Sequence, residues 1–180
     1  MFEDLNSWPE FAALRADLEE HTATLRQEAL GLLKTVEGGF KPWHEPQIYE
    51  GGWEVYGLFW NGREVERRTR APLSKEILGA WQPVVFNAGF SAMLPGVHIK
   101  PHVGYTDDVL RLHLALVVPE CESDKIGIRV GNQIRGWEAG KCHLFDDTQE
   151  HEAWNKSTAT RVVLLVDLLR PAGREKGVVR

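Results

Sequence analysis

Apolar positions in the first 40 residues recur at steps of three and four, which is the period of an amphipathic helix. The apolar stripe consists of Phe11, Leu14, Leu18, His21, Leu25, Ala29 and Leu32. Ser7-Trp8-Pro9-Glu10 combines an N-cap serine with an early proline and a glutamate three residues on, so a helix is expected to begin there. Gly38-Gly39 ends the pattern, and Gly31 is a candidate point of division. The sequence thus predicts a helical arm over residues 7–38 that lies against another element.

From Trp53 onward the pattern changes to short runs of aromatic and β-branched residues with a period of two, which is typical of strands. Asn61-Gly62 and Gly131-Asn132 suit tight hairpin turns, and a short helix is expected near Ser74–Trp81. Strands are expected at about 53–60, 63–68, 84–94, 97–102, 110–118, 126–130, 133–137, 141–145, 150–154 and 160–168. Many short strands with no long helix between them favour a sandwich or a jelly-roll barrel over a parallel sheet.

Composition narrows the class of protein. The chain has 180 residues, of which 43% are hydrophobic and 26% charged, and this balance predicts a single globular domain, residues 1–180. Its apolar runs are far shorter than the roughly 20 residues of a membrane span, and no signal peptide opens it, so we expect a cytoplasmic protein with no membrane partner. The net charge of −5 and the lack of a long basic run argue against nucleic-acid binding.

Two arginines stand in strands whose two faces both look buried. Arg111 and His113 share one face of the strand expected at 110–118, and Arg161 shares a face with Asp167 in the last strand. A buried guanidinium keeps its charge and needs an anion, ideally a carboxylate. That anion is either one of the protein's own acids or a small dianion. Asp167 lies roughly 20 Å along the strand from Arg161, so the two cannot pair within it.

Histidines cluster in the middle of the chain, where five of the seven lie between residues 98 and 151. His98, Lys100 and His102 share a strand face, and His151 precedes another strand. Neutral imidazole is the commonest metal ligand, so the pattern raises the possibility of zinc held by three histidines or of non-haem iron, beside purely structural roles.

The order of the rarer residues resembles a known family. The motifs are Ser91-x-x-x-Pro95-Gly96-x-His98-x-x-Pro101-His102-x-Gly104, Leu110-Arg111-x-His113-Leu114-x-Leu116-x-x-Pro119, Gly136-Trp137-Glu138-x-Gly140, Phe145-Asp146-Asp147-x-x-x-His151-Glu152-x-Trp154-Asn155 and Arg161-Val162-x-Leu164. This series resembles the aspartyl/asparaginyl β-hydroxylase family of iron(II)- and 2-oxoglutarate-dependent oxygenases. The resemblance implies a mainly β fold, a double-stranded β-helix (a cupin-like jelly roll) over residues 52–171, with the N-terminal helical arm beside it.

The resemblance also implies roles for individual residues. His102 and His151 would be the ligands of Fe(II), while Arg161 and Ser91 would hold the distal carboxylate of 2-oxoglutarate. His98 is expected to be structural.

His113 and Arg111 would lie near the metal-chelating end of the cosubstrate and the substrate carboxylate. Trp53 would line the cosubstrate pocket.

Two positions depart from what such oxygenases commonly carry. Gly104 stands two residues after the first histidine, where most of them have a carboxylate ligand. The best-known branch of the family also has glycine there and keeps iron with two histidines and water, whereas Asp107 or Asp108 would be a substitute ligand. Val109 replaces an arginine found in members that act on proteins, which argues for a small molecule, such as an amino acid or a carrier-tethered aminoacyl group.

The expected function is therefore hydroxylation by O₂ of an unactivated C–H bond, at the β-carbon of an amino acid or aminoacyl group, with release of succinate and CO₂. Two alternatives remain open at this point. The glycine at the carboxylate position would admit chloride in a halogenase, and a cupin-like domain would bind a dicarboxylate without turnover.

Overall fold

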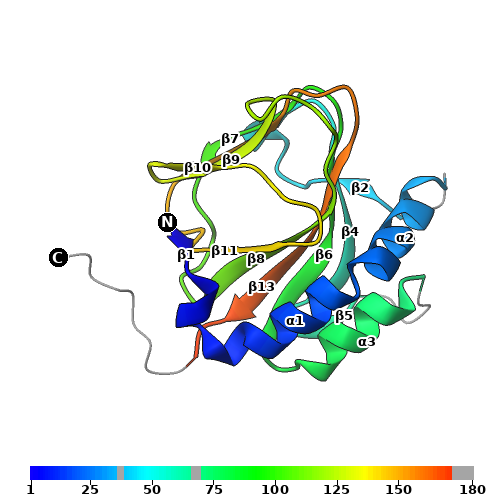
Figure 1. Ribbon diagram of the computed structural model, residues 1–180, viewed down its shortest axis with the longest axis vertical. Helices are drawn as coiled ribbons and strands as arrows, with labels where there is room; N and C mark the ends of the chain where they lie inside the picture. Colours follow the sequence, from blue (N-terminus) through cyan, green and yellow to red (C-terminus); the bar gives the residue numbers. More distant parts are fainter. Residues whose placement is uncertain (36–38, 66–69, 172–180) are drawn as a thin grey trace.

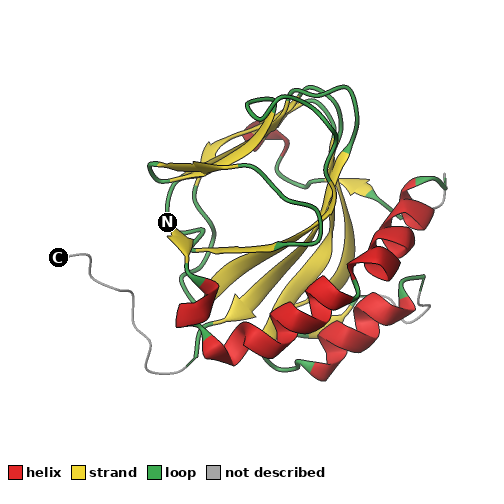
Figure 2. Ribbon diagram, in the orientation of Figure 1, coloured by secondary structure: helices red, strands yellow, loops and turns green. Residues whose placement is uncertain are grey.

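A computed structural model describes residues 1–35, 39–65 and 70–171. Two antiparallel sheets face each other, and helices cover the outside of the larger sheet (Figures 1 and 2). This arrangement confirms the predicted mainly β fold with an N-terminal helical arm. None of the helices within the described ranges has both the length and the apolar character needed to cross a membrane.

The larger sheet has eight strands, and its hydrogen-bonded order interleaves segments that are far apart in sequence. The order is β1 (Phe2–Glu3), β11 (Cys142–Phe145), β8 (Val109–Val117), β13 (Arg161–Leu169), β6 (Val85–Met93), β4 (Trp53–Trp60) and β2 (Lys41–Pro42), with β5 (Arg63–Glu64) paired to β4.

The smaller sheet has five strands and lies across the barrel from the larger one (Figure 1). Its order is β10 (Gln133–Arg135), β9 (Ile126–Val130), β12 (His151–Asn155), β7 (Val97–His102) and β3 (Tyr49–Glu50).

The strand predictions agree closely with the structure. Each predicted range contains a strand, and most ends differ by no more than two residues. The exception is 63–68, where β5 covers Arg63–Glu64 and residues 66–69 lie outside the described ranges. Both predicted hairpin turns are confirmed, between β4 and β5 and between β9 and β10. The two-residue strands β1, β2 and β3 were not predicted because so short a run carries no periodicity.

The helical arm differs from the prediction at its start. Two 3-10 turns, η1 (Leu5–Ser7) and η2 (Pro9–Phe11), precede α1 (Ala12–Glu20), whose N-cap residue Phe11 makes no side-chain capping bond. The predicted α-helical start at the capping box of residues 7–10 is therefore wrong. The physical reason is tertiary, because Trp8 is buried and stacks on Phe11 with ring centroids 5.8 Å apart.

The arm divides at His21, ten residues before the candidate Gly31, which stays inside α2 (Thr22–Leu33). His21 Nδ1 contacts the Asp17 carbonyl, and Thr22 Oγ1 donates to the Glu19 carbonyl at 2.8 Å, so side chains compete for backbone acceptors at the break. Residues 36–38, the predicted end of the arm, lie outside the described ranges. The remaining helices are α3 (Pro72–Ala80) and the 3-10 turn η3 (Pro46–Ile48).

Alternation along the strands divides the interior into two apolar clusters. Leu112 and Leu114 of β8 pack with the helices, including Leu18 of α1, in the cluster outside the larger sheet. Ala115 of β8 belongs to the cluster between the two sheets. Both faces of β8 are therefore buried, as predicted, and the inward face is the one that also carries arginine and histidine.

Candidate active site

A cavity lies between the two sheets. It is lined by Trp53, Ser91, Ile99, His102, Arg111, His113, Ile128, Phe145, His151, Ala153, Arg161 and Leu165. All seven residues that the sequence singled out for metal, cosubstrate or substrate are among them. Strand pairing explains this convergence, because the seven come from β4, β6, β7, β8, β12 and β13, whose inward faces meet in the barrel.

The two candidate metal ligands stand opposite each other. His102 at the end of β7 is the register partner of His151 at the start of β12, and their ring centroids lie 4.2 Å apart. His102 Nδ1 contacts the Lys100 carbonyl at 2.7 Å, and His151 Nδ1 contacts the Gln149 carbonyl at 2.9 Å. A carbonyl accepts only, so each Nδ1 carries a proton, and in the neutral ring Nε2 is the nitrogen with a free lone pair. The rings are thus held in the tautomer that binds a metal through Nε2.

His151 is also kept uncharged. Burial, and after it the neighbouring His102, lower the pKa of His151 to about 3. A neutral imidazole can donate its lone pair to a metal at physiological pH, whereas a protonated one cannot.

In the parts of the chain that the structure describes, no third His, Cys, Asp or Glu joins the two histidines in a group that could hold a metal ion. Asp107 and Asp108, the suggested substitute ligands, are exposed in the loop between β7 and β8. Asp108 accepts a hydrogen bond from Thr106 Oγ1 in the same loop. The protein therefore offers two imidazoles here, with Gly104 at the usual carboxylate position.

The space beside Gly104 is filled by another carboxylate. A Cβ atom built on Gly104 would lie 2.3 Å from Asp147 Oδ2 and 2.6 Å from Asp147 Oδ1. The Gly104 N–H donates to the Asp147 carbonyl at 2.7 Å, which fixes the two segments together. Asp147 is fully buried, and burial raises its pKa even though Arg111 opposes the shift. The glycine is thus the residue that allows a buried aspartate to occupy this space.

Arg161, at the start of β13, lines the cavity. It is 2% exposed, and among the described residues neither Nε nor Nη1 finds a hydrogen-bond acceptor. Its guanidinium carbon lies 4.6 Å above the Trp137 ring, and burial lowers its pKa to about 9, which leaves it charged at neutral pH. A buried, unpaired cation costs several kcal/mol, about 3–5, unless an anion meets it. Arg161 could therefore hold an anion in the cavity.

Ser91 and Trp53 lie on the same side of the cavity. Trp53 Nε1 donates to Ser91 Oγ at 3.0 Å, and Ser91 is 3% exposed. Because the indole N–H already supplies a proton to that oxygen, the serine O–H is free to donate to an anion in the cavity. Trp53 itself stacks on Trp43 with ring centroids 4.7 Å apart, which holds the donor in place.

His113 projects into the middle of the cavity between aromatic rings. It lies edge-on to Phe145 and stacks on Trp137, and neither ring nitrogen has a hydrogen-bond partner among the described residues. Burial and then the charges of Arg161 and Arg111 lower the pKa of His113 well below its ordinary value. It therefore stays neutral, with two unsatisfied nitrogens available to a ligand.

Arg111 contrasts with Arg161, because acids of the protein already engage it. Arg111 Nε donates to Asp167 Oδ1 at 2.8 Å, and Arg111 Nη2 lies 3.0 Å from Asp147 Oδ2. Asp167 is the register partner of Arg111 across β8 and β13. Of the two kinds of anion that the sequence left open, a salt bridge within the protein is the one that the structure shows at Arg111. The argument that Asp167 does not pair with Arg161 is confirmed.

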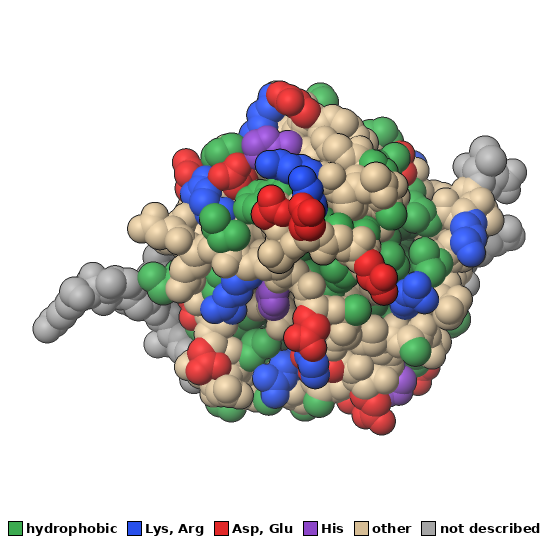
Figure 3. Space-filling model, turned by 45° about the horizontal axis from the view of Figure 1, so that its top comes forward, with side chains coloured by type: hydrophobic (Ala, Val, Ile, Leu, Met, Phe, Trp, Pro, Cys, Tyr) green, Lys and Arg blue, Asp and Glu red, His purple; other side chains and the backbone are tan. Residues whose placement is uncertain are grey.

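His98 and Lys100 do not line the cavity, whereas His102 does, so the prediction that the three share a strand face is wrong. The reason is a register shift where β7 pairs with β12, between the Ile99 and His102 positions. His98 Nε2 lies 2.8 Å from Glu152, which also accepts from Arg129, and Lys100 pairs with Glu50. This matches the structural role expected for His98. Acidic and basic side chains are interspersed across the face of the molecule in Figure 3.

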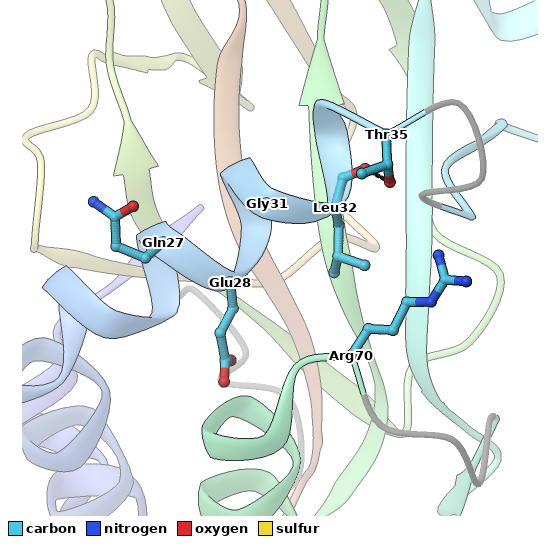
Figure 4. A pocket seen from close by; sticks show the side chains of 6 residues that line it. All are labelled: Gln27, Glu28, Gly31, Leu32, Thr35 and Arg70. Atoms are coloured by element: carbon cyan, nitrogen blue, oxygen red, sulfur yellow. Dashed lines mark hydrogen bonds between the residues drawn. The ribbon is translucent and has the colours of Figure 1, made fainter.

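A second hollow lies outside the barrel, where α2 meets the start of α3. Figure 4 shows its lining, which consists of Gln27, Glu28, Gly31, Leu32, Thr35 and Arg70. The Glu28 carboxylate accepts from the Leu73 and Ser74 N–H groups, so it caps α3. These six residues include no histidine or cysteine, whereas the cavity between the sheets is lined by three histidines.

Three residues of the site were not assigned a role from the sequence. Trp137 and Asp147 belong to the quoted motifs, but nothing in their spacing shows which side chain they meet. Asp167 was placed on the inward face by the period of two, yet its partner depends on strand register.

Comparison with known proteins identifies the family of this chain. Residues 19–171 match the family described as aspartyl/asparaginyl beta-hydroxylase. The chain belongs to this family. A protein of Rhizobium tropici named ornithine lipid ester-linked acyl 2-hydroxylase is 38% identical over 162 residues, which cover 90% of this chain and 55% of that protein. The aspartyl/asparaginyl beta-hydroxylase of Mus musculus is 32% identical over 166 residues, which cover 89% of this chain and 22% of that protein.

The chain thus spans only about half, or less, of the relatives it matches. Among solved structures, a Pseudomonas putida prolyl-4-hydroxylase superposes with a TM-score of 0.62 at 15% identity, covering 88% of this chain and 100% of that one. A 2OG-Fe(II) oxygenase family oxidoreductase of Burkholderia pseudomallei gives 0.55 at 13% identity, covering 82% and 79%. Such distant likenesses show the fold alone, and they confirm the double-stranded β-helix.

Proposed function

We propose that this protein is an iron(II)- and 2-oxoglutarate-dependent hydroxylase that acts on an unactivated C–H bond. The observation that carries the proposal is the pairing of two features in one cavity. His102 and His151 present their imidazoles side by side, and Arg161 presents a buried guanidinium with two nitrogens that find no acceptor among the described residues. Membership of the family supports the same conclusion.

The donor set fits iron(II). Two imidazoles without a thiolate suit non-haem iron, whose remaining positions are filled by small oxygen ligands. Cys121 is exposed and Cys142 buried away from the cavity, and both are unpaired, which fits the reducing cytoplasm. His102 and His151 would hold the metal through Nε2, since their Nδ1 atoms already face backbone carbonyls.

The unpaired arginine fits 2-oxoglutarate. Arg161 would bind the distal carboxylate in a bidentate fork, and Ser91 would donate its O–H to the same group. Trp53 keeps the Ser91 hydroxyl oriented. His113, neutral and without a partner among the described residues, would contact the metal-chelating end of the cosubstrate.

Bound iron(II) would supply the reaction of O₂ with 2-oxoglutarate, which releases CO₂ and places one oxygen atom of O₂ in succinate. The other oxygen atom would enter a substrate C–H bond. The protein itself would position the substrate and exclude water from the cavity. Its cavity is walled by Ile99, Ile128, Phe145 and other apolar side chains, which keep the reacting groups away from bulk solvent.

The substrate class is a small acyl or aminoacyl compound. The relative from Rhizobium tropici is named for an ester-linked acyl group, and the mammalian relatives for aspartyl and asparaginyl residues. Hydroxylation is favoured over halogenation because the space beside Gly104, which a halide would need, holds the Asp147 carboxylate.

Two measurements test the proposal. Anaerobic titration with iron(II) and 2-oxoglutarate should give saturable binding, and admission of O₂ should then form succinate. Arg161→Ala should weaken 2-oxoglutarate binding by about 2–5 kcal/mol because a buried charge pair is lost. Arg129→Ala removes an arginine from the outer face of the barrel and is the matched control.

His102→Ala should abolish succinate formation. A protein that binds 2-oxoglutarate but never forms succinate would be a binding domain and not an enzyme. Unchanged 2-oxoglutarate affinity in Arg161→Ala would show that the cosubstrate assignment is wrong.

A further inference from the structure

Trp137 packs its ring against the Arg161 guanidinium. The guanidinium carbon lies 4.6 Å from the centroid of the indole ring, well within the roughly 6 Å over which a ring face attracts a cation. Arg161 lines the cavity, whereas Trp137 is not among the lining residues and is 8% exposed. The ring therefore supports the guanidinium from behind the cavity wall.

A ring and a carboxylate stabilise a buried cation in different ways. A carboxylate accepts hydrogen bonds and so occupies N–H groups, as Asp167 does when it accepts from Arg111 Nε. A ring face attracts the charge through its quadrupole and is only a weak acceptor. In agreement, Nε and Nη1 of Arg161 find no acceptor among the described residues, although the side chain is 2% exposed. The contact with Trp137 thus stabilises the charge and leaves N–H donors for an anion in the cavity.

The segment that carries Trp137 is tied to the strand next to Arg161. Trp137 lies between β10 and β11, and in the same segment the Gly140 N–H donates to the Ala115 carbonyl at 2.8 Å. Ala115 of β8 is the register partner of Val163, two residues after Arg161 on β13. The ring and the guanidinium are therefore both positioned by the pairing of β8 with β13.

The same ring also packs on His113, with centroids 6.2 Å apart and planes inclined by 24°. Neither ring nitrogen of His113 has a hydrogen-bond partner within the described ranges. Trp137 therefore contacts two of the side chains that the proposed function assigns to 2-oxoglutarate, and in both it leaves the polar atoms unoccupied.

We propose that Trp137 is a positioning residue for 2-oxoglutarate, whose ring face holds the Arg161 guanidinium ready for the distal carboxylate without occupying the N–H groups that bind it. This inference rests on the proposed function. Trp137 acts through Arg161, since it does not line the cavity. Without the ring, the buried guanidinium would turn to water or to a backbone carbonyl and would have to leave that acceptor before binding the cosubstrate.

Binding of 2-oxoglutarate to the iron(II)-loaded protein, measured by anaerobic calorimetry, tests the positioning role without turnover. Trp137→Leu removes the ring and should weaken binding at least about fivefold, and Trp137→Phe, which keeps a ring face, should bind at least about twofold more tightly than Trp137→Leu. Trp8→Leu is the control, because Trp8 is 7% exposed and belongs to the cluster outside the larger sheet, so its removal should leave the affinity unchanged. An unchanged affinity in Trp137→Leu, or an equal loss in Trp8→Leu, would overturn the proposal.

A double-mutant cycle in the metal-free protein separates the charge from packing. Arg161→Met keeps an unbranched chain against the ring and removes the charge. In urea denaturation, Trp137→Leu should lower the folding equilibrium constant at least about fivefold more with Arg161 present than in the Arg161→Met background, because the ring face attracts only the cation. Trp137→Phe, the smaller change, should give the same sign with a smaller ratio. Equal losses in the two backgrounds for both Trp137 variants would show that the ring only fills space, and would overturn the proposal.

The two sets of measurements distinguish failure of this inference from failure of the proposed function. If the unaltered protein binds no 2-oxoglutarate, both are wrong. If it binds 2-oxoglutarate and Arg161→Ala weakens the binding while Trp137→Leu does not, the proposed function stands and the inference alone is wrong.

Discussion

Replacing Gly104 with alanine tests whether the space at the usual carboxylate position is occupied. The added Cβ would lie 2.3 Å from Asp147 Oδ2 and 2.4 Å from Asp147 Cγ. Ordinary contacts of a Cβ atom begin near 3.4 Å, so the clash exceeds 1 Å with the nearest atom. Asp147 cannot yield freely, because it is fully buried and paired with Arg111.

Overpacking of this kind costs about 1–3 kcal/mol of folding free energy. We therefore expect Gly104→Ala to lower the free energy of unfolding of the metal-free protein by this amount, measured by urea denaturation. Gly31→Ala is the control, because nothing lies within 4 Å of its new Cβ and alanine favours the interior of α2. That control should raise stability by about 0.5–1 kcal/mol.

A double-mutant cycle identifies the atom responsible. Removing the carboxylate with Asp147→Ala should make the second change, Gly104→Ala, nearly neutral, since the contact that opposes it is gone. If Gly104→Ala is as well tolerated as Gly31→Ala, or if its cost is the same with and without Asp147, the steric reasoning is wrong.

Three further predictions concern the cosubstrate wall, the pH dependence and a helix cap. Trp53→Phe removes the donor to Ser91 and should weaken 2-oxoglutarate binding by about 0.5–1.5 kcal/mol in anaerobic titrations; equal affinity would contradict the assigned role. The folded-state pKa of His113 is depressed, so the unfolded chain binds a proton there first, and this group alone lowers stability as pH drops below about 6.5, by at most about 1.4 kcal/mol per pH unit. His113→Asn should reduce that slope in denaturation curves of the metal-free protein, and an identical slope would refute the shift. Glu28→Ala removes the cap of α3 and should cost about 0.5–2 kcal/mol in thermal melts, whereas Glu76→Ala, within α3, should cost less.

The predicted start of the first helix was wrong because burial of aromatic side chains outweighed the local capping pattern. The capping box at residues 7–10 satisfies every sequence rule for a helix start, yet Trp8 and Phe11 pack against each other and α1 begins at Ala12. The predicted strand ends, by contrast, were close to those observed, because turn residues such as Asn61 and Gly62 adopt positive φ and stop a strand locally.

The sequence by itself determined most of the inward faces of the strands and the identity of the side chains on them; the exception is β7, where a register shift separates His102 from the face of His98 and Lys100. Alternation in a strand is local geometry, so a period of two already places Arg111, His113 and Arg161 inside the barrel. The spacing of the motifs then pointed to the two histidines that the structure brings within 4.2 Å, as ring centroids.

Only the tertiary structure decided which charges meet. Asp167 shares a strand face with Arg161 but pairs with Arg111, because the register of β8 against β13 sets those two side by side. Asp147 reaches the same guanidinium from the loop before β12, through space that Gly104 leaves open. Coulomb interactions depend on separation in space and not along the chain, so the ion pairs of Arg111, and the two Arg161 nitrogens without an acceptor among the described residues, emerge only when the strands are paired.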